Sequence, residues 1–374
     1  MISAGTLVVD GRVCRPGWLQ TSGRQILDSG AGTPPRAADL DLPDSVVVPG
    51  FIDMHVHGGG GASYTSHDGP EIARAAGFHR SHGTTSTLAS LVTAAPAELL
   101  AGVRALAEAT RGGIVAGIHL EGPWLSPARC GAHDHTLMRD PDPAEIDAVL
   151  AAGGDAIQMV TLAPERPVSE WAIRRFLDAG VVVAVGHTDA TYEQVSQAVE
   201  LGATVGTHVF NAMPPPHHRE PGPALALLQD PRVTVELIAD GVHLHPAVVR
   251  AVIEASGPDR VALVTDAIAA AGCGDGAFRL GTVPIDVASG VARVHGTSTI
   301  AGSTATMDRL FRIVAEPGSD AALAAAVQMA STTPARALGL VGVGDLQPGY
   351  DANLVVLDGD LRVSAVMVHG DWVQ

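Results

Sequence analysis

The chain has 374 residues, a formal net charge of −17 at pH 7, and 46% hydrophobic, 17% charged and 3% aromatic residues. These values describe a globular protein and argue against a disordered or fibrous one. The negative charge disfavours nucleic acid or an anionic membrane surface as a partner, because both require a basic face.

Two further features of the composition exclude classes of chemistry. All 23 basic side chains are arginine, so Schiff-base chemistry, a phosphate-loop lysine and a carbamylated lysine between two metal ions are impossible. Cys14, Cys130 and Cys273 form no Cys-x-x-Cys pair, which fits a reducing compartment and argues against a thiolate metal site.

With no secretion signal and no apolar run near the roughly 20 residues of a membrane span, we expect a cytoplasmic protein.

The two ends of the chain resemble each other in pattern. From Met1 to about Pro43, and again from Gly344 to Gln374, short Val/Leu runs are broken by Gly and Pro. This pattern predicts short strands and turns. We therefore expect residues 1–45 and 343–374 to form one small β-sandwich domain.

Between these ends, apolar strand-like runs alternate with segments of helical period, which is typical of repeated strand–helix units on a parallel sheet. Eight predicted strands make an α/β protein with a (β/α)8 TIM-like barrel over residues 46–342 the leading fold. A Gly-rich interruption at Ala269–Val294 predicts a lid or hairpin at the barrel mouth, and helical pattern resumes over Ser303–Arg336. The predicted strands are Val46–His57, Thr84–Leu91, Ile114–Glu121, Ala156–Leu162, Val181–His187, Ala203–Phe210, Val233–Ile238 and Val261–Thr265. The predicted helices are Glu71–His82, Pro96–Thr110, Pro143–Ala152, Ser169–Ala179, Tyr192–Leu201 and Pro246–Ser256.

Residues of the types that bind metal ions cluster at the predicted strand ends. Period-two alternation puts His55 and His57 on one face at the end of the first strand. The carboxyl ends of barrel strands converge on one face, where active sites lie. Imidazole and carboxylate groups there suit a divalent cation. The sequence therefore predicts a metal site from six residues at five strand ends, namely His55, His57, Glu121, His187, His208 and Asp266.

Several motifs extend this pattern over nearly the whole chain. They are Pro49-Gly-Phe-Ile-Asp-Met-His-Val-His-Gly, His119-Leu-Glu-Gly-Pro-Trp, Gly186-His-Thr-Asp-Ala, Thr207-His-Val-Phe-Asn-Ala-Met, Ala239-Asp-Gly-Val-His and Leu263-Val-Thr-Asp-Ala. With these motifs the sequence resembles the N-acetylglucosamine-6-phosphate deacetylase family of the amidohydrolase superfamily.

The resemblance implies a role for each matching residue. It makes Glu121, His187 and His208 the ligands of a principal divalent metal ion, zinc or another transition metal. It gives His55 and His57 a possible second ion, so that one or two ions are expected per subunit. Since no lysine is available, Glu121 and a water would have to bridge two ions. Asp266 becomes the general acid/base and His133 polarises the substrate.

The resemblance also implies how a phosphorylated amino sugar is held. Phosphate contacts fall to Arg219 and His243, with further contacts around Asn211 and Ala212. Part of the phosphate site would come from a neighbouring subunit, so a homodimer is expected. An alternative for Arg219 is an exposed loop arginine paired with Glu220.

Metal-dependent removal of the acetyl group from N-acetylglucosamine 6-phosphate, in amino-sugar catabolism or recycling, is the leading hypothesis. One alternative is an amidohydrolase acting on N-acetylgalactosamine 6-phosphate or on a cyclic amide, although the missing lysine disfavours the carbamate-dependent cyclic amidases. A catalytically inactive scaffold is a third reading, which the intact set of Glu121, His187, His208 and Asp266 opposes. Imidazole and carboxylate ligands leave the identity of the metal open.

Overall fold

The computed structural model describes residues 1–315 and 318–373. The chain divides into two compact units, one of Met1–Asp53, Gly77–Ser86 and Thr306–Gln374, the other of Met54–Ala76 and Thr87–Ala305. The domain boundaries expected at 45/46 and 342/343 stay a prediction. Among the described residues, no helix has the length and apolar character needed to cross a membrane.

The chain ends form one sheet in the first unit. Its strand order is β21-β20-β19-β5-β1-β3-β4, with β2 paired to β1. Most pairs are antiparallel, but β1 and β5 run parallel. Apolar side chains from both termini, among them Leu7, Val47 and Leu354, share one buried core, which confirms the prediction of a β unit built from both ends. The strands are β1 (Ile2–Val9), β2 (Arg12–Cys14), β3 (Gly17–Ser22), β4 (Gln25–Ala31), β5 (Leu40–Pro49), β19 (Leu354–Leu357), β20 (Val363–Val368) and β21 (Asp371–Trp372).

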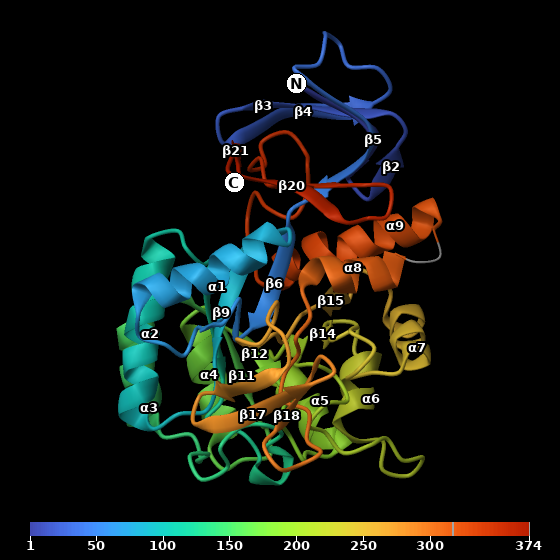
Figure 1. The fold of residues 1–374 in the computed structure, drawn as a ribbon. Helices are drawn as coiled ribbons and strands as arrows, with labels where there is room; N and C mark the ends of the chain where they lie inside the picture. The colour runs from blue at the N-terminus through green and yellow to red at the C-terminus, as the bar shows by residue number, and fades with distance from the viewer. Residues whose placement is uncertain (316–317, 374) are drawn as a thin grey trace. The chain divides into compact units, whose positions relative to one another are not determined.

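The predicted barrel is present as an eight-stranded parallel sheet with the order β15-β14-β13-β12-β11-β10-β9-β6. The segment that follows β15 meets the end of β6 through backbone hydrogen bonds from Asp266 to His55 (2.9 Å) and from His57 to Ala267 (2.8 Å). Helices α2 to α7 lie around the strands (Figure 1). The strands are β6 (Phe51–Val56), β9 (Thr84–Leu91), β10 (Gly117–Glu121), β11 (Ile157–Leu162), β12 (Val182–Val185), β13 (Val205–Gly206), β14 (Thr234–Leu237) and β15 (Val261–Leu263).

Local signals at the helix starts explain why these helices were predictable. A proline occupies the first turn of α2, α3 and α7, where the missing N–H costs nothing. Thr191 and Gln194 form a reciprocal capping box on α5. Helix α6 was not predicted, because its start at Pro221-Gly222-Pro223 reads as a turn. The helices are α1 (Gly69–Ser81), α2 (Pro96–Arg111), α3 (Pro143–Gly153), α4 (Ser169–Asp178), α5 (Tyr192–Leu201), α6 (Gly222–Gln229), α7 (Pro246–Ser256), α8 (Met307–Ala315), α9 (Asp320–Val327) and α10 (Thr333–Ala337).

The run Val46–His57 was predicted as one strand, and this prediction is wrong. The structure breaks it at Gly50 into β5, which pairs with β1, and β6, which belongs to the barrel. A Cβ at Gly50 would lie 2.2 Å from Thr85 Oγ1. Only glycine allows the chain to pass Thr85 this closely.

The interruption after residue 269 is a three-stranded antiparallel sheet of β16 (Gly276–Leu280), β17 (Val283–Ala288) and β18 (Val291–Val294). Leu280, Ile285 and Val287 from this sheet share a buried core with Val92 and Ile268. The hairpin is therefore packed onto the barrel unit. The remaining short elements are β7 (Gly58–Gly59), β8 (Ala62–Ser63), the 3-10 turns Pro127–Arg129 and Gly154–Ala156, and the π-helical turn Gln328–Thr332.

Candidate metal centre

The residues predicted to bind metal sit where barrel strands end. His55 lies in β6 and Glu121 is the last residue of β10, while His187, His208 and Asp266 follow β12, β13 and β15. Three of these residues have a left-handed backbone, with φ of 46° at His187, 25° at His208 and 47° at Asp266. Such values are rare outside glycine and cluster at functional sites. They let the chain leave the strand sharply while the side chain stays at the barrel end.

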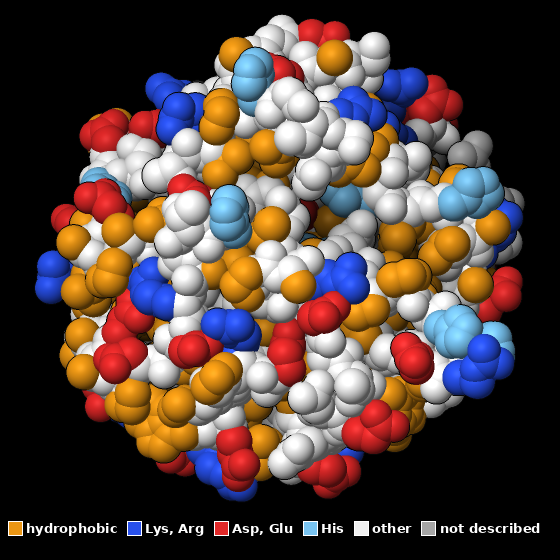
Figure 2. Space-filling view, turned by 90° about the horizontal axis from the view of Figure 1, so that it is seen from below, with side chains coloured by type: hydrophobic (Ala, Val, Ile, Leu, Met, Phe, Trp, Pro, Cys, Tyr) orange, Lys and Arg blue, Asp and Glu red, His pale blue; other side chains and the backbone are white. Residues whose placement is uncertain are grey.

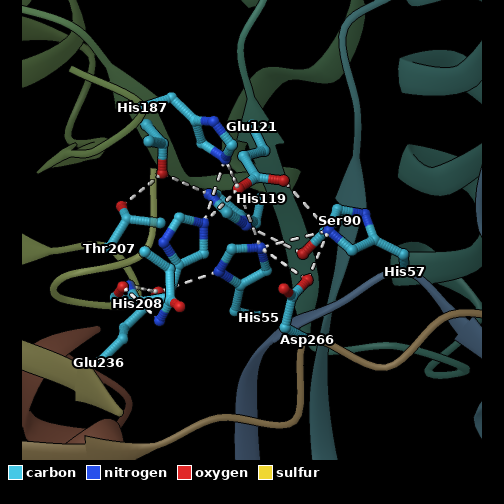
Figure 3. Close-up of polar contacts among 12 residues, drawn as sticks. His55, His57, Ser90, His119, Glu121, His187, Thr207, His208, Glu236 and Asp266 are labelled. Atoms are coloured by element: carbon cyan, nitrogen blue, oxygen red, sulfur yellow. Dashed lines mark hydrogen bonds and ion pairs between the residues drawn. The ribbon is translucent and has the colours of Figure 1, made fainter. Parts of the chain in front are cut away.

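The carboxylate of Glu121 is the centre of the site (Figure 3). Its Oε1 lies 3.0 Å from Nε2 of His187 and 3.0 Å from Nε2 of His208. Its Oε2 lies 3.1 Å from Nε2 of His57 and 3.1 Å from Nε2 of His133. All of these side chains are buried. One carboxylate therefore contacts both the His187/His208 pair and the His55/His57 side.

Asp266 adds a second carboxylate on the His55/His57 side. Its Oδ1 lies 3.1 Å from Nε2 of His57 and 3.6 Å from Nε2 of His55. The two imidazole Nε2 atoms are themselves 3.2 Å apart. Asp266 is 8% exposed, so it also borders the open space in front of the cluster.

The donor atoms of this cluster fit a divalent cation. His187 Nδ1 donates to the backbone carbonyl of Arg129 at 2.8 Å, which leaves Nε2 as the unprotonated nitrogen of the neutral ring. This acceptor nitrogen then faces the acceptor Oε1 of Glu121. Two acceptors at this distance repel each other unless a proton or a metal cation lies between them. Ligand atoms around a tetrahedral zinc ion lie about 3.3 Å apart, close to the spacing found here.

The pKa values of the cluster reflect the close approach of its carboxylates and imidazoles. Burial raises the pKa of Glu121, but the imidazoles of His55 and His133 outweigh it and hold that pKa well below its ordinary value. Burial lowers the pKa of His57, but hydrogen bonds to Asp266 and Glu121 outweigh it and raise that pKa to about 9. The protein alone therefore holds protons here, and a cation would displace them.

His133 differs from His187 because its Nδ1 accepts a hydrogen bond, whereas Nδ1 of His187 donates one. The backbone N–H of Thr93 donates to His133 Nδ1 at 3.2 Å, so the neutral ring carries its proton on Nε2. Burial lowers the pKa of His133 to about 4, since it outweighs the favourable contact with Glu121. His133 is thus a neutral N–H donor at the edge of the site.

A cavity of about 270 Å³ opens in front of the cluster. Asn211, Ala212 and His243, which were predicted to contact substrate, line it together with His133 and Asp266. The hairpin contributes Leu280, and the segment after it contributes Ser298, Thr299 and Ile300. The face drawn in Figure 2 mixes acidic and basic side chains and is hollowed near its centre, where a histidine side chain is visible.

His243 is held by an aspartate that the sequence did not single out. Asp240 Oδ2 accepts from His243 Nδ1 at 2.9 Å, while its Oδ1 accepts from the backbone N–H groups of Val242 and His243. Burial lowers the pKa of His243, but Asp240 outweighs it and the net shift is upward. His243 therefore favours its cationic form away from the Glu121 cluster, which suits an anionic ligand.

Arg219 is not brought to this cavity. It lies in an exposed loop, where its Nη1 is 2.8 Å from His218 Nε2. Its partner is thus His218 and not Glu220, the alternative considered above. Its predicted role in phosphate binding stays a prediction, as do the roles of the other site residues.

Two further buried polar groups border the site: Glu236, which sequence reasoning missed, and His119, which period-two alternation places on the same face as Glu121. Glu236, in β14, has a fully buried side chain whose Oε2 lies 2.9 Å from His55 Nδ1. The sequence feature that could have revealed Glu236 is a charged residue in the middle of an apolar strand. His119 links Ser90 (2.9 Å) and Thr161 (2.8 Å), and Thr161 reaches Thr207 (2.8 Å). This hydrogen-bonded layer crosses the barrel interior, and its partners come from strands far apart in sequence.

Comparisons with known proteins agree with this geometry. The sequence profile described as "Amidohydrolase family" matches residues 46–373. N-acetylgalactosamine-6-phosphate deacetylase of Escherichia coli O157:H7 is 36% identical over 95% of both chains. N-acetylglucosamine-6-phosphate deacetylase of Bos taurus is 38% identical over 90% of this chain and 86% of its own. A mutant N-acetyl-D-glucosamine-6-phosphate deacetylase of Mycobacterium smegmatis, solved with N-acetyl-D-glucosamine-6-phosphate, is 54% identical with a TM-score of 0.98, covering 100% of this chain and 98% of that one.

Proposed function

The chain belongs to the amidohydrolase family, and from this we propose that it hydrolyses the N-acetyl group of N-acetyl-D-glucosamine 6-phosphate to give D-glucosamine 6-phosphate and acetate. The observation that carries the chemistry is the Glu121 carboxylate, buried among imidazoles at the floor of a cavity that Asp266 and His133 also line. The full-length similarity to deacetylases of this phosphorylated sugar supports the choice of substrate.

Glu121, His187 and His208 would hold the principal metal ion, and such an ion activates a water and polarises a carbonyl. Asp266 supplies the proton transfer. Burial raises its pKa, but the hydrogen bond from His57 and the charge of His55 outweigh it, so the pKa lies below its ordinary value and the group is an ionised base. It accepts the proton of the attacking water and passes it to the departing amine.

His133 stabilises the charge that forms on the acetamide oxygen. Its Nε2–H points into the site, because the backbone of Thr93 occupies Nδ1. A fixed, neutral donor of this kind needs no reorganisation as the oxyanion develops. Asn211 and Ala212 line the same cavity and offer further polar contacts to the sugar.

The phosphate end is held by His243, whose cationic form Asp240 favours. Arg219 would contact phosphate from the partner subunit of a homodimer, since in its own chain it lies in an exposed loop outside the cavity. Light scattering of the purified protein should therefore give the mass of a dimer. Arg219→Ala should raise KM far more for the phosphorylated than for the unphosphorylated sugar, and equal effects would count against this role.

A second candidate substrate is N-acetylgalactosamine 6-phosphate. The observation that favours it is the deacetylase of Escherichia coli O157:H7, which is similar over 95% of both chains. The two sugars differ only in the orientation of one hydroxyl. Acetate release from both sugars at equal concentration decides between them through the ratio of kcat/KM.

The remaining features follow from the same assignment. The protein acts in amino-sugar catabolism or recycling in the cytoplasm, on a small-molecule substrate, with one or two zinc or other transition-metal ions per subunit. The absence of lysine and of a Cys-x-x-Cys pair supports a centre of imidazole and carboxylate ligands.

The test is acetate release from N-acetylglucosamine 6-phosphate by protein purified without chelator, with bound metal counted on the same sample. Acetate released in proportion to metal supports the proposal. A metal-loaded protein that releases no acetate from either phosphorylated sugar overturns the substrate assignment.

A further inference from the structure

Glu236 is a buried anion that the mechanism above does not use. It lies in β14 within Thr234-Val-Glu-Leu, and its side chain is fully buried. Carboxylates are almost never buried without a charged or hydrogen-bonded partner, because desolvation of the charge is costly. Its place inside the barrel therefore requires a compensating group.

The partners of Glu236 are two groups of the metal centre. Its Oε2 accepts from His55 Nδ1 at 2.9 Å and from the backbone N–H of His208 at 3.1 Å. Its Oε1 has no hydrogen-bond partner among residues 1–315 and 318–373. No arginine contacts it there, and the chain has no lysine. A positive charge beside Glu236 can therefore come from His55 in two ways. The ring can be protonated, or it can bind a cation.

The contact fixes the orientation of His55 in its neutral form. A carboxylate accepts, so His55 Nδ1 donates and its Nε2 keeps the lone pair. That Nε2 lies 3.2 Å from His57 Nε2, 3.4 Å from Glu121 Oε1 and 3.6 Å from Asp266 Oδ1. The lone pair thus points into a group of further metal-binding atoms.

The same oxygen also reaches the other half of the centre. His208 has φ of 25°, a strained value for a residue with a side chain, which persists only when neighbouring groups hold it. The hydrogen bond from its N–H to Glu236 is one such restraint. Glu236 therefore connects the His55/His57 side to the His187/His208 side, as Figure 3 shows.

We propose that Glu236 is a positioning residue that fixes His55 as a neutral ligand through Nε2 and so enables His55 and His57 to hold a second divalent cation beside the principal one. The proposal rests on the metal-dependent function above but not on the identity of the substrate. Partners of this kind set the tautomer and orientation of a ligating histidine, and their loss costs about 10- to 100-fold in metal affinity.

The first test measures zinc binding by metal-free protein against a competing chelator. Wild type should bind a second zinc equivalent per chain, and Glu236→Leu should weaken it by about 10- to 100-fold. Glu236→Gln, which keeps an acceptor oxygen but loses the charge, should fall between them. Thr234→Val, which alters the same strand but leaves Glu236 in place, should bind zinc as wild type does.

A double variant tests whether Glu236 acts through His55. If it does, Glu236→Leu should weaken the second zinc equivalent in the wild-type background but should not change whatever binding remains at that second site once His55 is alanine. An additional loss of the second equivalent in the double variant would overturn the proposal. So would a single equivalent in wild type, or equal affinities in wild type and Glu236→Leu.

The second test needs no variant that might fail to fold. In zinc-loaded wild type with ¹⁵N-labelled histidine, long-range ¹H–¹⁵N spectra should show His55 protonated on Nδ1 and bound through Nε2. A proton on Nε2 of His55 would overturn the proposal. Neither measurement uses the sugar, so a protein that passes both but releases no acetate contradicts the proposed function and leaves the role of Glu236 standing.

Discussion

Replacing His133 with alanine tests how the site stabilises the reaction's developing charge. The ring contributes a single Nε2–H donor, held by the Thr93 backbone at Nδ1 and buried at 7% exposure. Removing one such donor typically costs about 10²- to 10³-fold in kcat, or roughly 2.7–4 kcal/mol. Since the bond strengthens as charge forms on the oxygen, we expect the loss in kcat and a much smaller change in KM.

Thr93→Val is the matched control. It removes the hydroxyl that lies 3.0 Å from His133 Nδ1 but keeps the backbone N–H that fixes the ring. Losing one ordinary hydrogen bond of about 0.5–1.5 kcal/mol should lower kcat by roughly tenfold at most.

The assay is acetate release over a range of substrate concentrations, with metal counted in each sample because His133 also contacts Glu121. Two results would refute the reasoning. One is a metal-loaded His133→Ala variant whose kcat is within about threefold of wild type, because that loss is far smaller than the one expected. The other is a loss confined to KM.

Three further predictions address other parts of the molecule. Asp266→Asn, which suits the left-handed backbone there, should fold, retain metal and lose about 10²- to 10⁴-fold in kcat; near-normal acetate release would end the acid/base assignment. Asp240→Asn should raise KM about tenfold, or about 1.4 kcal/mol, for the phosphorylated sugar but not for the unphosphorylated one; parallel changes would show that the Asp240–His243 pair does not serve the phosphate. For Asp308, burial raises the pKa, but hydrogen bonds from His82, Thr306 and Arg312 outweigh it and the pKa falls below its ordinary value. Its contribution to stability is therefore full above its unfolded pKa near 3.9 and is lost as pH falls below that value. Urea unfolding should show Asp308→Asn less stable than wild type by roughly 1–3 kcal/mol at pH 7, with the gap narrowing toward pH 3, and a gap independent of pH would contradict this.

The sequence by itself determined the barrel and the neighbourhood of its site. Period-two and period-3.6 patterns are local, so the strands and most helices were readable, and Thr84–Leu91 and Tyr192–Leu201 match the predicted bounds. Parallel strands end on one face, which is why side chains as distant in sequence as His55 and Asp266 could be expected together. Helix α6 and the break at Gly50 were missed, because Pro-Gly-Pro also reads as a turn and because the contact with Thr85 is not visible in sequence.

Only the tertiary structure decided which atoms of these residues meet. Glu236 and His55 are 181 positions apart, and nothing local to Thr234-Val-Glu-Leu tells which ring its carboxylate will reach. The tautomers of His187 and His133 likewise depend on a carbonyl and an N–H supplied by loops, at Arg129 and Thr93. Side-chain periodicity places a residue on a face, but hydrogen-bond partners across a barrel are set by register and packing, which no short stretch of sequence contains.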